Sequence, residues 1–183
     1  MKKRWSRALV PVVCVVALTG ALSQAAADDP VIALRARLNG LEEVPPIFTP
    51  GRGTFHGTLS ADRTTLTFRL DWRDLRAPAQ VAHIHFGQRR VAGGVMIFLC
   101  GGGNQPDCPT ETTAHIEGTA TMANVTGPEG QGIAPGDFAA AVEALLTGQT
   151  YVNVHTEPFP AGEVPRSAAK CGSRTRRTSA SSI

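Results

Sequence analysis

The stretch 151–163, which reads Tyr-Val-Asn-Val-His-Thr-Glu-Pro-Phe-Pro-Ala-Gly-Glu, decides the fold better than any other part of the chain. Its first residues have a strand pattern, because successive side chains of a strand point to opposite faces. Two valines share one face, and Tyr151, Asn153 and His155 share the other. Two prolines and Gly162 then mark the end of the strand and a turn. The stretch therefore predicts a strand with one apolar face and one polar, histidine-bearing face.

A second stretch, 81–87, has the same pattern. Its apolar residues at 82, 84 and 86 share one face, and His83 and His85 lie on the opposite face. Residues two positions apart in a strand have backbones about 6.6 Å apart, so the imidazoles of these two histidines can converge on one ion. If the two strands are neighbours, His155 supplies a third nitrogen. Three protein ligands and one open position are typical of catalytic zinc sites, and imidazole also suits copper.

A structural role is the alternative for these histidines. In that case His83, His85 and His155 would hydrogen-bond to loops and to a motif that fixes the proline-rich turn. The residues of that motif are Asn153, Thr156, Gly162 and Glu163. The remaining histidines, His56 and His115, are scattered, and we expect them on the surface.

The rest of the chain shows further short alternating segments. Strands are expected at 31–38, 54–59, 64–71, 95–99 and 114–122, and in the last of these Ile116 and Met122 are expected to point inward. One helix is expected over 137–147, with Asp137 as its cap and Gly148 after its last turn. About seven short strands and one short helix predict a mainly β fold, an antiparallel Greek-key β-sandwich.

The amino terminus has the pattern of a secretory signal peptide. Four basic residues precede an apolar run from Ala8 to Leu22, and three alanines follow at 25–27. Cleavage is expected after Ala27, with Ala25 as the alternative. We therefore expect a signal peptide over 1–27, one domain over 28–164, and a secreted protein, extracellular or periplasmic, without a membrane span after cleavage.

The charge of the expected domain excludes one class of partner. The chain has 18 basic and 15 acidic residues; four basic residues precede Asp28 and five follow Glu163, which leaves nine against 15, a net charge of −6. Because nucleic-acid binding needs a basic folded body, a nucleic-acid partner is not expected. The expected partner is an extracellular protein or glycan.

The cysteines fit an exported protein. Cys100 and Cys108 are expected to form a disulfide across the loop between them, and Cys171 is left over. The spacing of a zinc-binding cysteine pair is absent. Nucleophile-elbow, phosphate-loop and dinucleotide-binding signatures are also absent, so we expect no enzymatic reaction and no catalytic residues.

Several motifs resemble the CHRD (chordin) domain family. They are Leu-Asn-Gly-Leu-Glu-Glu-Val-Pro-Pro at 38–46, the segment 51–59, Ala-His-Ile-His-Phe-Gly at 82–87, Ala-Leu-Leu-Thr-Gly-Gln-Thr-Tyr-Val-Asn-Val-His-Thr at 144–156, and Pro-Ala-Gly-Glu-Val at 160–164. The resemblance covers 31–164 and implies an exported, single-domain β-sandwich of the bacterial type, without an assigned reaction.

The chain departs from the family pattern after Val164. Members of the family usually continue with Gly-Glu-Ile-Arg-Gly-Gln as a last strand, whereas here Pro165 follows and a tail rich in serine, arginine and threonine ends the chain. One cytosine inserted into codons for Glu-Val-Arg-Gly-Gln-Leu-Arg would encode Glu-Val-Pro-Arg-Ser-Ala-Ala, the residues found at 163–169. We therefore expect a disordered or frameshifted tail over 165–183, and a sheet without its closing strand.

The functional prediction is an exported CHRD-like binding or structural module. The alternative is a domain that binds copper or zinc through His83, His85 and His155, with redox activity; a His-x-His strand in an exported Greek-key sandwich is loosely similar to copper-zinc superoxide dismutase at the level of the fold.

Overall fold

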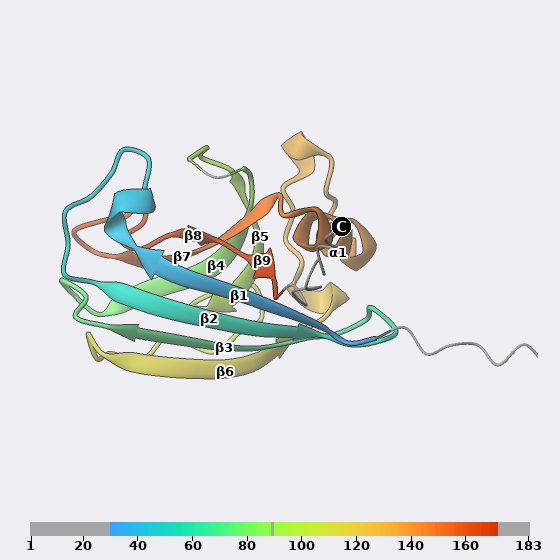
Figure 1. The fold of residues 1–183 in the computed structure, drawn as a ribbon, viewed down its shortest axis with the longest axis horizontal. Coiled ribbons are helices and arrows are strands. Elements are labelled where there is room, and N and C mark those ends of the chain that lie inside the picture. Colours follow the sequence, from blue (N-terminus) through green and yellow to red (C-terminus); the bar gives the residue numbers. More distant parts are fainter. Residues whose placement is uncertain (1–29, 89, 172–183) are drawn as a thin grey trace, which may run out of the picture.

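The computed structural model describes residues 30–88 and 90–171, which form two antiparallel sheets packed face to face (Figure 1). One sheet has five strands in the order β6-β3-β2-β1-β9, and the other has four in the order β5-β4-β7-β8. The strands are β1 (Ile32–Asn39), β2 (Arg52–Leu59), β3 (Leu66–Arg73), β4 (Ala79–Phe86), β5 (Gly94–Cys100), β6 (Ala114–Ala120), β7 (Thr150–Thr156), β8 (Arg166–Ser167) and β9 (Ala169–Lys170). The predicted β-sandwich is confirmed.

Alternating apolar residues place the core between the sheets. In β1, Leu34, Ala36 and Leu38 are buried and the arginines between them are exposed. The same alternation places Phe55 of β2 and Leu70 of β3 in the core. Pairing in register joins these strands, because Ala36 lies opposite Phe55, which lies opposite Leu70. Burial of such side chains stabilises the fold by about 1.5–3 kcal/mol each.

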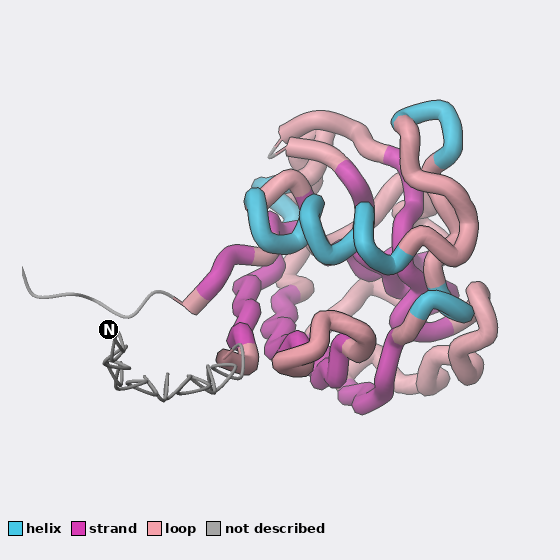
Figure 2. The backbone as a smooth tube through the Cα atoms, turned by 90° about the vertical axis from the view of Figure 1, so that its right-hand side faces the viewer, coloured by secondary structure: helices cyan, strands magenta, loops and turns pink. Residues whose placement is uncertain are grey.

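A single α-helix, α1 (Phe138–Thr147), lies across one end of the sandwich in the described chain (Figures 1 and 2). The Asp137 carboxylate accepts a hydrogen bond from the Ala140 backbone N–H at 2.9 Å, which satisfies an N–H of the first helical turn. Gly148 follows the last turn with φ 73°, the left-handed conformation that glycine adopts without strain. Phe138, Val142 and Leu145 are buried against the core. Both expected helix boundaries are therefore correct.

A disulfide bond joins Cys100, the last residue of β5, to Cys108 in the connection to β6. It closes the glycine-rich loop between them. Cys171 is a free, exposed thiol.

Two expectations about the strands were wrong, and the first concerns Met122. The segment predicted as a strand to residue 122 ends at Ala120, and Met122 begins a short 3-10 helix, η2 (Met122–Asn124). Met122 is 64% exposed, so it is not a core residue. Thr121 caps η2 through its hydroxyl oxygen, and this local capping competes with continued strand pairing.

The second concerns the closing strand, which the sequence predicted to be missing. Residues 165–171 instead form β8 and β9, and the prediction that the tail over 165–183 arises from a frameshift stays a prediction. The strand β8 pairs with β7, and β9 pairs with β1, each over two residues. Ala168 between them is 1% exposed. Burial of this alanine and backbone pairing hold the segment, although its residues depart from the family pattern.

The expected signal peptide and the residues after Cys171 lie outside the described residues. Within 30–88 and 90–171, no helix is long and apolar enough to cross a bilayer.

Candidate metal centre

Three histidines meet on the outer face of the four-stranded sheet. The strands β4 and β7 are antiparallel neighbours, with Val81 opposite His155 and His83 opposite Asn153. His83 and His85 therefore lie beside His155. One ring nitrogen from each of the three imidazoles lies within 4.8 Å of the others. Adjacency of the two strands, on which the predicted cluster depended, is present.

Loops cover this outer face, so the cluster is buried. The exposed fractions of His83, His85 and His155 are 5%, 7% and 6%. The Nδ1 atom of His85 lies 2.9 Å from the Gly93 carbonyl oxygen, and the Nδ1 atom of His155 lies 3.0 Å from the Pro160 carbonyl oxygen. Since a carbonyl oxygen can only accept, these Nδ1 atoms carry the ring protons. The lone pairs of both rings are therefore on Nε2.

The third imidazole adds a nitrogen to this pair. The Nδ1 atom of His83 lies 2.9 Å from the Nε2 atom of His85, to which it donates when no ion is bound. An ion would take the place of that proton, which His83 can carry on its other ring nitrogen instead. The Nε2 atom of His155 is buried, and among the described residues it has no hydrogen-bond partner. A buried acceptor without a partner costs about 1–3 kcal/mol, and a bound cation would satisfy it.

Aromatic rings hold two of the imidazoles in place. Tyr151 stacks on His85, with ring centres 4.5 Å apart and planes 6° apart, and its hydroxyl oxygen accepts a hydrogen bond from the Gly93 backbone N–H at 3.1 Å. Phe98 packs edge-on against His83 with ring centres 5.1 Å apart. The alternation in 151–155 placed Tyr151 on the face of His155, but no sequence signal placed Phe98 or Gly93 here.

Burial keeps the three rings neutral. Desolvation, followed by repulsion from His155 and His85, lowers the pKa of His83 from 6.5 to about 2. Desolvation also lowers the pKa of His85 to about 4, and that of His155 below its usual value, although their backbone partners at Gly93 and Pro160 act in the opposite direction. Neutral imidazole is the form that ligates metals, so a bound ion would displace few protons near neutral pH.

The predicted turn motif has partners of its own. Glu163 is fully buried, and its carboxylate accepts hydrogen bonds from the hydroxyls of Thr49 and Thr156 and from the Arg76 backbone N–H. None of the three imidazoles hydrogen-bonds to Asn153, Thr156 or Glu163 within the described chain, so this part of the structural alternative is wrong. The hydroxyl and N–H donors around Glu163 take up its acceptor sites instead.

Asn153 ties the loop before β2 to the turn after β7. Its side-chain NH₂ donates to the Glu43 carboxylate at 3.0 Å and to the Ala161 carbonyl oxygen at 3.5 Å. Gly162 packs directly on this pair, since a Cβ there would overlap with Asn153 Nδ2 and with Glu43 Oε2. No sequence signal indicated that Glu43 belongs to this network, because it lies 110 residues before Asn153.

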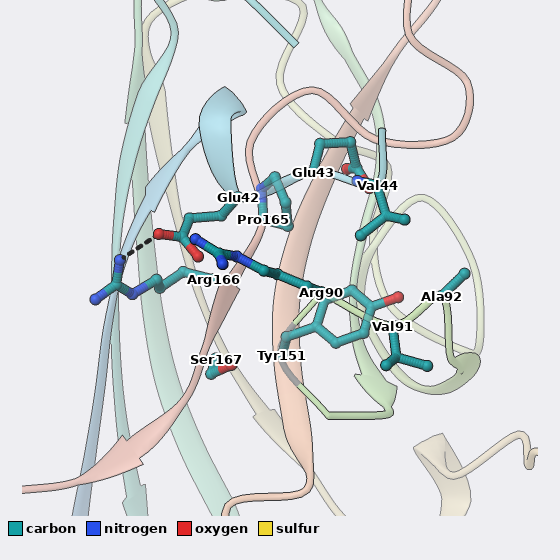
Figure 3. A pocket seen from close by; sticks show the side chains of 10 residues that line it. All are labelled: Glu42, Glu43, Val44, Arg90, Val91, Ala92, Tyr151, Pro165, Arg166 and Ser167. Carbon is teal, nitrogen blue, oxygen red and sulfur yellow. Dashed lines mark hydrogen bonds and ion pairs between the residues drawn. The ribbon is translucent and has the colours of Figure 1, made fainter. Parts of the chain in front are cut away.

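A small cavity lies beside Tyr151 (Figure 3). Its volume is about 20 Å³, which is room for one water molecule. Tyr151, Arg90 and Glu43 line it, and Glu42 and Arg166 form an ion pair at 3.0 Å at its edge. The cavity therefore borders Tyr151, the residue whose ring stacks on His85.

These features define a class, a disulfide-bonded β-sandwich module with a buried three-histidine cluster under its loops. Residues 34–165 match the model of the CHRD domain, and the chain belongs to the CHRD domain family. Searches of curated proteins and of solved structures gave no match. Family membership supports a binding or structural module and specifies no reaction.

Proposed function

We propose that this CHRD domain is an exported module that binds one copper or zinc ion through His83, His85 and His155. The observation that carries the proposal is the buried Nε2 atom of His155, which has no partner among the described residues and lies beside two further imidazoles. Imidazole nitrogen is a preferred ligand of both metals. A bound copper ion could cycle between its two oxidation states, whereas zinc could not.

The backbone carbonyls around the cluster support this proposal. Ligand histidines usually donate their second ring N–H to a carbonyl or carboxylate, which fixes the ring and makes the other nitrogen a better ligand. His85 and His155 have this arrangement with Gly93 and Pro160. Histidines that only filled space would not need to bring three ring nitrogens together in this way.

The spacing of two nitrogens bears on the choice of metal. His83 Nδ1 and His85 Nε2 are 2.9 Å apart. Two nitrogens at this distance, each about 2.0–2.1 Å from one ion, subtend about 90° at it. This angle suits a tetragonal copper(II) site. A tetrahedral zinc site would require the nitrogens to separate to about 3.3 Å.

Negative charge on the same side of the sheet would favour a buried cation, and Glu43, which accepts a hydrogen bond from Asn153 opposite His83, could supply it. Glu43 is 8% exposed, lies on the same side of the sheet, and donates no ligand to the cluster. Desolvation raises its pKa, and the hydrogen bonds from Val44 and Asn153 act in the opposite direction. A cation in the cluster would favour its ionised form.

The test is the metal content of the chain without residues 1–27, purified without a histidine tag and titrated with copper(II) and zinc. We expect about one equivalent bound, with at least a tenfold loss of affinity in His155→Ala, as for removal of a ligand or its support. The matched control is His56→Ala/His115→Ala, which removes two exposed histidines.

Electron paramagnetic resonance of the copper form gives a second readout. Nitrogen hyperfine structure in the chain, altered in His83→Ala and unchanged in the control, would support the proposal. The same metal content in His155→Ala and in the unaltered chain would contradict it, and so would the absence of bound metal.

The predicted binding or structural role is the second candidate. Family membership favours it, and a partner among extracellular proteins or glycans would be consistent with export. A chain that binds no metal, but is retained by material from the cell surface, would support this role.

A further inference from the structure

The outer face of the five-stranded sheet is basic, although the domain as a whole is acidic. The strands β6, β3, β2 and β1 lie side by side (Figure 1), and every second side chain faces outward. The charged and histidine side chains on this face are Arg35, Arg37, Arg52, His56, Arg69, Asp71, Arg73, His115 and Glu117. Five arginines thus lie among two acidic residues, in a domain whose net charge over 28–163 is −6.

The two acidic residues are held by a single arginine. Arg69 forms ion pairs with Asp71 at 2.6 Å and with Glu117 at 2.5 Å. These two carboxylates are therefore already engaged and compensate the remaining arginines of the face only weakly. Arg73 forms an ion pair with Asp74, at the exposed end of its strand. Exposed ion pairs of this kind contribute little to the stability of the fold.

Arginines of neighbouring strands converge at one end of this face. Arg52 of β2 lies directly opposite Arg73 of β3. Like charges in directly opposite positions destabilise a sheet. Arg37 of β1 lies opposite Thr54, two residues along β2 from Arg52. A groove of about 560 Å³ lies here, lined by all three arginines, by His115 and Thr54, and by Asp71, whose carboxylate is paired with Arg69.

From this groove we infer that the outer face of the five-stranded sheet binds an acidic polysaccharide. The Arg52 guanidinium is fixed by hydrogen bonds from its Nη1 atom to the carbonyl oxygens of Thr49 and Gly51, and its remaining N–H groups can donate to a ligand. An anionic group in the groove would relieve the repulsion between Arg52 and Arg73. Arginine pairs with planar carboxylate and with sulfate through several parallel hydrogen bonds.

The chemistry of the face favours a polysaccharide over other polyanions. Stable protein interfaces have an apolar or aromatic centre. None of the exposed large apolar side chains in the described chain belongs to these four strands. Single-stranded nucleic acids require aromatic rings on which bases stack, but Trp72, which also lines the groove, is 2% exposed. The threonines and arginines can instead hydrogen-bond to hydroxyl and acidic groups of sugars.

The inference is tested with the chain from Asp28 to Ile183, by fluorescence anisotropy of labelled polygalacturonate and dextran sulfate. We expect binding of at least one of them that weakens as salt rises. The variant Arg37→Gln/Arg73→Gln should bind about tenfold more weakly, because it removes two charge-assisted contacts. The control Arg90→Gln/Lys170→Gln removes the same charge away from the groove and should bind like the unaltered chain.

Three further probes distinguish an acidic polysaccharide from a neutral sugar chain, an acidic peptide and a nucleic acid. Neutral dextran, poly-glutamate and single-stranded DNA should bind at least tenfold more weakly than the acidic polysaccharide. Equal binding of any of them, equal loss in the two double variants, or no binding of either acidic polysaccharide would overturn the inference. The variants carry changes at exposed positions, and an unchanged melting temperature confirms that they fold.

Discussion

At the scale of single residues, the histidine face depends on one glycine. Gly162 has φ +134°, which side chains rarely adopt, and the position of its missing Cβ is taken by the Asn153 amide and the Glu43 carboxylate. The close approach of these groups ties the turn after β7 to the loop before β2. Both loops lie over the face on which the imidazoles meet. The conformation of one residue therefore affects how well the cluster is covered.

Gly162→Ala should destabilise the domain by about 2–5 kcal/mol, because it combines backbone strain with an overpacked site. Urea unfolding measures the change. Gly148→Ala is the control: its φ is 73°, and nothing lies within 4 Å of its added Cβ. It should cost about 1–2 kcal/mol through strain alone. Equal losses in the two variants would show that the contacts at Gly162 are unimportant.

At the scale of elements, β4 and β7 bring the cluster together, and much of this pair could be predicted from alternation alone. Alternation gave the correct faces for His83, His85 and His155, because a strand offers only two. Alternation could not predict how deeply these three histidines are buried. Both faces of β4 are buried because loops cover the outer one. The hydrogen bonds to Gly93 and Pro160 depend on how the loops that follow β4 and β7 fold back over this face.

Alternation fails to predict strands and buried residues where local hydrogen bonding or packing against distant parts of the chain determines the structure. Met122 fits the strand pattern by parity, but Thr121 caps a 3-10 helix and the methionine is exposed. The short strands β8 and β9 each pair over two residues, too few for any period to be visible. Ala168 between them is buried because the strands on either side of it pair with the two sheets, and no sequence pattern marks it as a core residue.

The buried histidines should make the metal-free domain sensitive to acid. The folded pKa values of His83 and His85, about 2 and about 4, lie below the ordinary value of 6.5 because both rings are desolvated. Below pH 6.5 the unfolded chain takes up protons that the folded chain does not, so stability is complete above this pH and is lost as pH falls towards 4. The slope should be about 1.4 kcal/mol per pH unit for each histidine.

Chemical unfolding in the presence of a chelator, from pH 7.5 to 4.5, measures this slope. His83→Gln should reduce it by about the contribution of one histidine. His56→Gln, at an exposed position, should leave it unchanged. A slope that is the same in all three proteins would mean that groups besides His83 cause the acid sensitivity.

At the scale of the whole molecule, the two proposed sites occupy opposite layers. The histidine cluster lies on the outer face of the four-stranded sheet, and the arginine groove lies on the outer face of the five-stranded sheet. A shared core separates them. A ligand on one face therefore need not obstruct the other, and variants in each site can be compared independently.

The segment after Val164 adds a strand to each sheet, and its removal measures what it contributes. Ending the chain at Val164 removes β8, β9, the buried Ala168 and the ion pair between Arg166 and Glu42. We expect a loss of about 2–4 kcal/mol relative to a chain ending at Cys171, because several hydrogen bonds and one buried side chain are lost. Thermal unfolding of the two chains gives the comparison.

Unchanged stability would support the hypothesis that residues 165–183 arise from a frameshift and are not selected for the fold. The gene sequence tests that hypothesis directly, since the alternate frame after Val164 must then encode Arg-Gly-Gln.

The placement of the histidines on β4 and β7 also determines when the cluster can form. His83 and His85 precede α1, and His155 follows it, 72 residues after His83. Closing so long a segment is an entropically costly step, and contacts of high sequence separation form slowly. The third imidazole arrives only when β7 docks beside β4. The moment at which refolding chains bind an ion tightly would therefore report when β7 docks beside β4. A chain interrupted before β7 would have only two of the three ligands.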